Sequence, residues 1–160
     1  MDFIEVIEKR HSVRKYTGEA VPRFLLDEIL EEAKTAPSSK NSKSTAFMVL
    51  EDRDLIDAVS EMRDRGTRFL KEAPAAIVVL GDSEKSDMWE INSTISATFI
   101  QLSAVSKGLG TCWAHVLGRG KTMEDGSQRM AEDYLRELLG IKDNYKVLCV
   151  IAVGYESENA

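Results

Sequence analysis

The chain has 160 residues, which suits one domain and is too short for two, so we expect a single unit over residues 1–160. Its formal net charge is −6, and no stripe of Lys and Arg runs along it, which argues against a nucleic-acid partner. No stretch reaches the roughly 20 apolar residues that cross a bilayer, and the charged N-terminus has no apolar signal region. We therefore predict a cytoplasmic protein with no membrane partner. Cys112 and Cys149 lack metal-type spacing and are read as buried thiols, with no metal site.

The first part of the chain predicts two helices joined by a basic segment. Asp2 can cap a short helix that ends near Arg10. Pro22 fits the first turn of a second, amphipathic helix, and Pro37 should stop it. The segment PSSKNS that follows is expected to be a loop.

Two compact apolar runs then predict buried strands. AFMVL (46–50) and AAIVVL (75–80) are rich in β-forming residues. The charged segment between them, EDRDLIDAVSEMRDR (51–65), has a helical pattern.

The longest helix is expected from Asp87 to Lys107. Asp87 and Glu90 are spaced for an N-terminal capping box, and Gly108 is placed to end the helix. Because ISATFIQLSAV is apolar on nearly every side, this helix should be central.

The last third predicts two more strands and one helix. TCWAHV (111–116) looks extended, GRGKTMEDGS (118–127) reads as a polar loop, and QRMAEDYLRELLG (128–140) is an amphipathic helix closed by its final glycine. VLCVIAVGY (147–155) is the last buried strand. The order of elements indicates a sheet flanked by helices, of either the α+β or the α/β class.

The segment RHSVRKY, residues 10–16, is a candidate anion site. In an extended backbone Arg10, Ser12 and Arg14 project on the same side, and two guanidiniums with one hydroxyl match the oxygens of a phosphate monoester. The alternative is a solvated helix end whose arginines pair with some of the 27 acidic residues. Taken alone, the motif favours this alternative.

Two further segments carry polar groups suited to a cofactor. APSSKNS (36–42) offers hydroxyls and an amide that can bond the polar edge of a planar heterocycle. GLGTCW (108–113) places a tight glycine turn before an aromatic residue. Taken alone, the first segment is only a plausible loop, and the second is better read as a helix end that enters a strand.

Together the segments resemble the nitroreductase family of flavin-dependent oxidoreductases. RHSVRKY is similar to the family's Arg-x-Ser-x-Arg-x-aromatic motif, and APSSKN to its Pro-Ser-x-x-Asn loop. SAVSKGLGTCWAH resembles its Ala-rich helix followed by Gly-Leu-Gly-x-Cys-Trp, and VIAVGY resembles its last core strand. The resemblance covers nearly the whole chain.

The resemblance implies an α+β fold, with a central sheet flanked by helices around a long central helix, in an intertwined homodimer with two FMN molecules at the interface. Four residues of one subunit are implied to contact the phosphate, ribityl chain and pyrimidine edge: Arg10, His11, Ser12 and Arg14. Four residues of the partner are implied to line the ring: Pro37, Ser38, Ser39 and Asn41. The backbone around Leu117 and Gly118 is implied to approach flavin N5.

The implied activity is ping-pong electron transfer from NADH or NADPH to a nitroaromatic, quinone or other electron-poor acceptor. The cofactor supplies the chemistry, so no side chain needs to be a nucleophile, and no catalytic residue is named. His115 is read as a hydrogen-bonding residue of the core or interface. The sequence departs from the family at NSKST (41–45) and in having no basic residue after GY near its end. Two other interpretations stay open: a protein that stores or senses FMN, and an interaction protein that has lost its cofactor.

Overall fold

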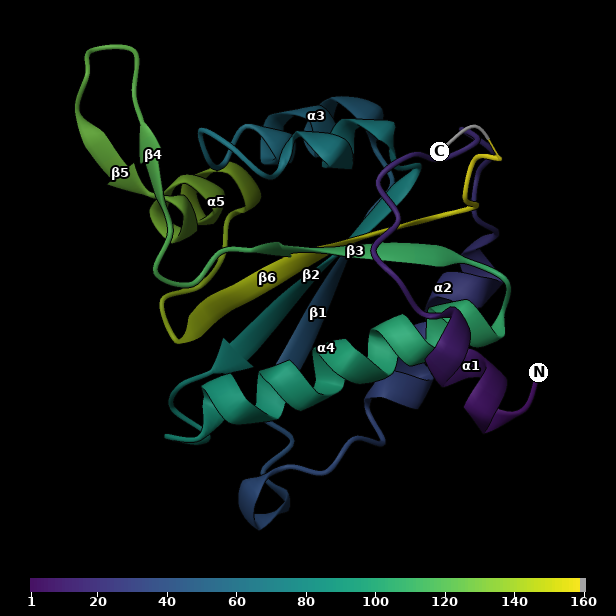
Figure 1. The fold of residues 1–160 in the computed structure, drawn as a ribbon. Coiled ribbons are helices and arrows are strands. Elements are labelled where there is room, and N and C mark those ends of the chain that lie inside the picture. The colour runs from purple at the N-terminus through teal and green to yellow at the C-terminus, as the bar shows by residue number, and fades with distance from the viewer. Residues whose placement is uncertain (159–160) are drawn as a thin grey trace.

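The computed structural model describes residues 1–158, and its centre is one four-stranded sheet (Figure 1). In spatial order the strands are β1 (Thr45–Leu50), β2 (Ala75–Asp82), β6 (Tyr145–Gly154) and β3 (Gly110–His115). All three neighbouring pairs are antiparallel. The predicted α+β class is therefore confirmed, and the α/β alternative is wrong.

The two inner strands are buried on both faces. In β2 the even-numbered residues from 76 to 80 pack in one apolar cluster, and the odd-numbered residues from 75 to 79 pack in the other. Successive side chains of a strand point to opposite faces, so helices on both sides of the sheet require a continuous apolar run. This is why the sequence of β2 and β6 does not alternate between apolar and polar residues.

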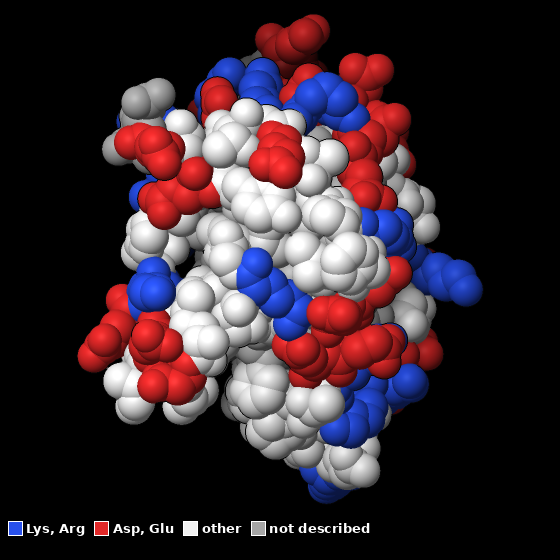
Figure 2. Space-filling view, turned by 90° about the vertical axis from the view of Figure 1, so that its right-hand side faces the viewer, with Lys and Arg blue, Asp and Glu red and all other residues white. Residues whose placement is uncertain are grey.

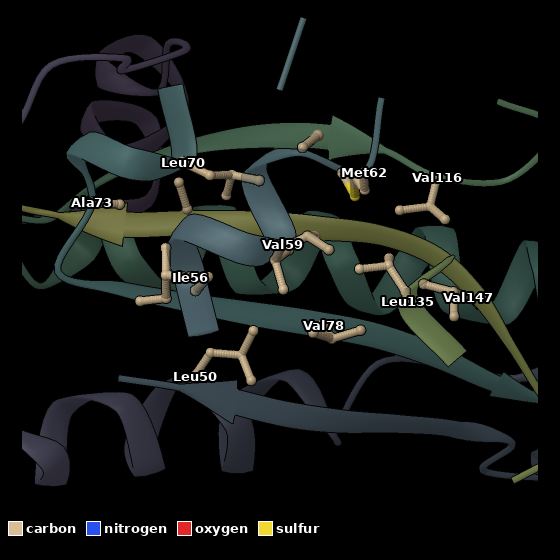
Figure 3. Packing of buried hydrophobic residues seen from close by; sticks show 14 of the residues in the cluster. Leu50, Ile56, Val59, Met62, Leu70, Ala73, Val78, Val116, Leu135 and Val147 are labelled. Carbon is tan, nitrogen blue, oxygen red and sulfur yellow. The ribbon is translucent and has the colours of Figure 1, made fainter. Parts of the chain in front are cut away.

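Helices cover both faces of the sheet. One face carries α2 (Arg23–Ala33) and α4 (Trp89–Ser106), with α1 (Phe3–Lys9) lying against α4. The other face carries α3 (Arg53–Ser60), the 3-10 helix η2 (Arg68–Glu72) and α5 (Ala131–Leu139). Figure 3 shows Ile56 and Val59 of α3 packed over the sheet, with Val78 of β2 beneath them. No helix within residues 1–158 is long and apolar enough to cross a membrane.

Two predicted helix ends are confirmed by their caps. The Asp2 side chain accepts a hydrogen bond from the backbone N–H of Glu5 at 3.0 Å, and the Glu5 side chain accepts from the N–H of Asp2 at 2.9 Å. Gly140 ends α5 in the left-handed conformation, with φ of 67°. At the start of α2, Pro22 is the N-cap residue, one position before the first turn where it was expected.

The predicted capping box of the long helix is wrong. Helix α4 begins at Trp89, its N-cap residue is Met88, and no side chain caps it. The Ser86 hydroxyl instead accepts a hydrogen bond from the Met88 N–H at 3.0 Å, so a tight turn replaces the first helical turn. Asp87 is exposed.

The expected polar loop at 118–127 instead begins a short β-hairpin, whose second strand takes the first three residues of the helix predicted over 128–140, so that helix begins only at Ala131. Strands β4 (Gly120–Thr122) and β5 (Gln128–Met130) pair antiparallel. The carboxylate of Asp64 accepts bonds from the backbone and hydroxyl of Thr122 at 3.0 and 2.8 Å. Strands of three residues are too short for a periodic sequence signal.

Helix α3 is also shorter than its charged pattern suggested, because the chain turns after Ser60.

Candidate functional site

The basic segment after α1 runs extended along the outer edge of β3. Ser12 forms a parallel bridge with Thr111, whose carbonyl accepts a hydrogen bond from the Val13 N–H at 2.9 Å. Val13 is buried, whereas Arg10, Ser12 and Arg14 are exposed. Of the two arrangements open to this motif, an extended segment and a helix end, the structure has the extended one, and the core-facing Val13 lies between Ser12 and Arg14.

Neither arginine of this segment is neutralised inside the chain. Among residues 1–158, no carboxylate forms an ion pair with Arg10 or Arg14. Burial raises the pKa of the Cys112 thiol, while the charge of Arg14 and a hydrogen bond with Ser12 act against that rise. Arg14 and Ser12 thus lie close together beside β3, with guanidinium donors open to an anion.

His11 differs from its three neighbours, because both of its ring nitrogens already have partners. Nδ1 lies 2.8 Å from the carbonyl oxygen of Lys9, and Nε2 lies 2.9 Å from Oε1 of Glu156. These two contacts, the one with Glu156 being the larger, raise the pKa of His11. A cavity of about 400 Å³ lies beside His11 and Glu156. The side chain of His11 therefore joins the N-terminal segment to the segment after β6.

The loop after α2 has an unusual backbone. Lys40, Asn41 and Lys43 have φ angles of 54°, 52° and 49°, in the left-handed region that β-carbon-bearing residues rarely adopt. Such residues cost about 1–3 kcal/mol each and persist only where surrounding contacts hold them. Strain of this kind is typical of functional loops.

One buried side chain of α4 holds this loop. The side-chain oxygen of Asn92 accepts a hydrogen bond from the Ser39 N–H at 2.9 Å, and its nitrogen donates to Ser44 at 2.9 Å and to Ser42 at 3.3 Å. The backbone N–H of Lys43 donates to the Ser38 hydroxyl at 3.0 Å. Asn92 thus ties both ends of the loop to the long helix.

A cavity opens where the loop meets the sheet. It has a volume of about 380 Å³ and is lined by residues that include Ser38, Lys43 and Phe47. The Lys43 ammonium donates to the carbonyls of Lys34 and Ala36 at 3.4 and 3.3 Å. The loop therefore presents hydroxyls and a positive charge beside an aromatic ring.

The two candidate halves lie at opposite edges of the sheet. The segment 10–14 borders β3, the last strand in spatial order, whereas the loop 37–43 leads into β1, the first. The cavities beside them share no lining residue. One chain therefore does not bring the predicted site residues together.

The turn after β3 offers one free backbone donor. The N–H groups of Val116 and Leu117 both donate to the carbonyl of Leu148, at 3.0 and 3.1 Å. Gly118 has φ of 73°, and its N–H has no acceptor within residues 1–158. Of the two residues expected near flavin N5, only Gly118 presents an unused N–H.

The indole of Trp113 donates to Nδ1 of His115 at 3.1 Å, and the two rings stack. Burial, with the charges of Arg119 and Arg63, lowers the pKa of His115. The imidazole of His115 accepts a hydrogen bond at Nδ1 and has a lowered pKa, so it is in the neutral form at pH 7. His115 therefore has the hydrogen-bonding role expected from the sequence.

Sequence reasoning missed Asn92 and Glu156. Asn92 had no clear local signal, because it stands among other polar residues at the start of α4, such as Ser93 and Thr94. Glu156 had no local signal, because its partner His11 is 145 positions away in the chain. Within the described residues, no three His, Cys, Asp or Glu side chains gather as a metal site.

Comparison with known proteins identifies the family. The model of the Nitroreductase family matches residues 7–63 and 58–155. A "Putative NADH dehydrogenase/NAD(P)H nitroreductase" of Methanothermobacter thermautotrophicus is 33% identical over 162 residues, covering 99% of this chain and 80% of that protein.

Two solved structures share the fold over nearly the whole chain. An FMN-dependent nitroreductase from Clostridium difficile R20291 aligns with a TM-score of 0.89 at 40% identity, covering 97% of this chain and 88% of that one. A putative NADH dehydrogenase/NAD(P)H nitroreductase from Parabacteroides distasonis aligns with a TM-score of 0.86 at 32% identity, covering 98% and 88%. The resemblance read from four sequence motifs is thus confirmed, and this chain belongs to the nitroreductase family.

Proposed function

We propose that the protein is an FMN-dependent oxidoreductase that takes electrons from NADH or NADPH and passes them to nitroaromatics, quinones or similar electron-poor rings. The observation that carries the proposal is the pair Arg10 and Arg14. They are exposed and form no ion pair with any carboxylate of residues 1–158, in a chain that has 27 acidic residues, which is unexpected for arginines that serve only solubility. The nitroreductase from Clostridium difficile named above is described as FMN-dependent, which agrees with this choice of cofactor.

The chemistry of these donors fits the phosphate of FMN. Two guanidiniums and the Ser12 hydroxyl supply charge-assisted hydrogen bonds of the kind that hold phosphate oxygens. When bound, FMN would accept hydride from the nicotinamide donor and pass the electrons on to the acceptor. No side chain is therefore required to act as a nucleophile. The N–H of Gly118, which has no acceptor within residues 1–158, would then donate to the ring. Pro37, Ser38, Ser39 and Asn41 of a second copy would line it.

Because the two halves lie at opposite sheet edges, we propose that a second copy completes each site. Helix α1 has three exposed apolar side chains, Phe3, Ile4 and Ile7, with exposed fractions of 66%, 62% and 47%. Ile91 of α4 is 52% exposed. Figure 2 shows broad uncharged areas on the side of the molecule where α1 lies, with charged groups between and around them. Apolar surface of this kind is typical of an interface between subunits.

The test is the visible spectrum of the purified protein after incubation with FMN and desalting, combined with its mass in solution. We expect a dimer that retains flavin, is bleached by NADH or NADPH without oxygen, and recovers its colour in air with a quinone or nitroaromatic acceptor. Retained flavin that neither nucleotide bleaches would favour a storage or sensor protein. Failure to retain flavin would overturn the proposed cofactor.

A further inference from the structure

Arg63 and Arg119 both lie near the end of β3, and within residues 1–158 neither forms an ion pair with a carboxylate. Nη1 of Arg63, in the turn after α3, donates to the carbonyl oxygen of His115 at 3.3 Å. Arg119 belongs to the turn that follows β3, which is closed by a hydrogen bond from its N–H to the carbonyl of Val116 at 3.0 Å. Both cations therefore border the same short stretch of backbone, residues 115–119.

Their charges repel one another. Burial and the nearby charge of Arg119 lower the pKa of Arg63, and both arginines lower the pKa of His115. The only carboxylate that acts on His115 is Glu90, and within residues 1–158 it forms no ion pair with either arginine. Arg53, Arg68, Arg129 and Arg136 each have a carboxylate within 4.0 Å. Arg63 is half-buried, and a half-buried charge that faces a like charge costs free energy that a bound anion would recover.

The pair also borders the backbone group assigned to hydride transfer. Arg119 directly follows Gly118, whose N–H is free, and Arg63 holds a carbonyl three residues before that glycine. The hairpin that starts at Gly120 leads away from the turn and leaves Arg119 exposed. An anion held by the two guanidiniums would thus lie next to the ring that exchanges electrons.

We propose that Arg63 and Arg119 form an anion subsite for the molecule that exchanges hydride at the proposed flavin, and this rests on the proposed function. The shared chemistry is an oxyanion. It could come from the pyrophosphate of the nicotinamide donor or from a carboxylate on the aromatic acceptor. In either case the subsite selects an anionic redox partner over a neutral one of the same shape.

The first test measures binding without turnover. Inorganic pyrophosphate and benzoate are titrated into the FMN-loaded protein, followed through the flavin spectrum, and into the protein as purified, followed through tryptophan fluorescence. We expect Arg119→Gln to raise the Kd of at least one of these anions about tenfold, the scale of one charged hydrogen bond. Arg63→Gln should act in the same direction. Arg65→Gln, in the same turn, is the matched control and should change the Kd less than about twofold.

The second test identifies the source of the anion. Flavin reduction is compared for NADH and the less charged donor 1-benzyl-1,4-dihydronicotinamide, and reoxidation is compared for 4-nitrobenzoate and 4-nitrobenzyl alcohol. A loss in Arg119→Gln confined to NADH assigns the subsite to pyrophosphate, and a loss confined to 4-nitrobenzoate assigns it to a carboxylate acceptor. Equal losses for charged and uncharged partners, no loss at all, or the same loss in Arg65→Gln would overturn the proposal. Failure of the proposed function is distinguishable, because the protein would then retain no flavin while the fluorescence titration still reports the anion.

Discussion

The side-chain oxygen of Asn92 lies 2.9 Å from the backbone nitrogen of Ser39 and accepts its hydrogen bond, although the residues are 53 positions apart. Through this contact the long helix α4 holds a loop with three left-handed non-glycine residues. The loop is therefore positioned by the core of its own subunit before any cofactor or partner arrives.

Asn92→Ala should loosen this loop. The Ser39 N–H and the Ser44 hydroxyl lose their buried partner, which costs about 1–3 kcal/mol of unfolding free energy, measurable by urea denaturation. FMN affinity should fall with it. Thr94→Ala, on the exposed side of the same helix, is the control, and equal FMN affinity in the two variants would contradict the role of Asn92.

Arg14→Ala should weaken FMN binding by about 1.5–3 kcal/mol, which corresponds to roughly tenfold or more in Kd, because one charged hydrogen-bonded contact to phosphate is lost. Fluorescence titration of the protein with FMN measures it. Lys15→Ala removes a neighbouring positive charge and should have little effect. If both variants bind FMN like the wild type, Arg14 does not hold the phosphate.

Gly110→Ala should separate the basic segment from β3. A β-carbon at Gly110 would lie 2.7 to 3.0 Å from the side-chain carbons of Val13, a distance that forces one of them to move. Overpacking of this kind costs about 1–3 kcal/mol. Thermal unfolding should show the loss, and adding Val13→Ala should recover part of it. If the double variant loses more unfolding free energy than the two single variants lose in sum, this clash is not the cause.

The contributions of His11 and His115 to the unfolding free energy should depend on pH in opposite directions. The contact with Glu156 raises the pKa of His11, so its contribution is fully present below the unfolded value of about 6.5 and is lost as the pH rises through the folded pKa. The pKa of His115 is lowered, so the unfolded chain takes up its proton first and stability falls as the pH drops below about 6.5.

Urea unfolding between pH 5 and pH 9 of Glu156→Gln and His115→Gln separates the two effects. Glu156→Gln should reduce the stabilisation below neutral pH by a few tenths of a kcal/mol, since the pair is exposed to solvent. His115→Gln should remove the loss at low pH. Identical pH profiles in wild type and both variants would show that neither shift affects folding.

Much of the fold was predictable from the sequence because its signals are local. The capping pair Asp2 and Glu5, the left-handed Gly140 and the apolar runs of the strands each act over a few residues. The spacing of residues 10–14 allowed either a helix end or an extended segment, and the bridge between Ser12 and Thr111 decided for the extended one. The strands β4 and β5 escaped prediction, because three residues carry no periodic signal and the hairpin is held by Thr122 meeting Asp64, 58 positions away. The late start of α4 also escaped, although the bond from the Met88 N–H to Ser86 that precedes it is local.

The sequence by itself determined the chemistry of the candidate site, since residue types set which donors and charges are available. Only the tertiary structure decided which of them are free. In the folded chain both ring nitrogens of His11 and the N–H of Leu117 have hydrogen-bond partners. Within residues 1–158, Arg14 has no ion-pair partner and the N–H of Gly118 has no acceptor. The fold also brings Arg63 beside the turn that carries Arg119. Hydrogen bonds and charge repulsion act through space, and partners separated by tens of residues leave no mark on local sequence pattern.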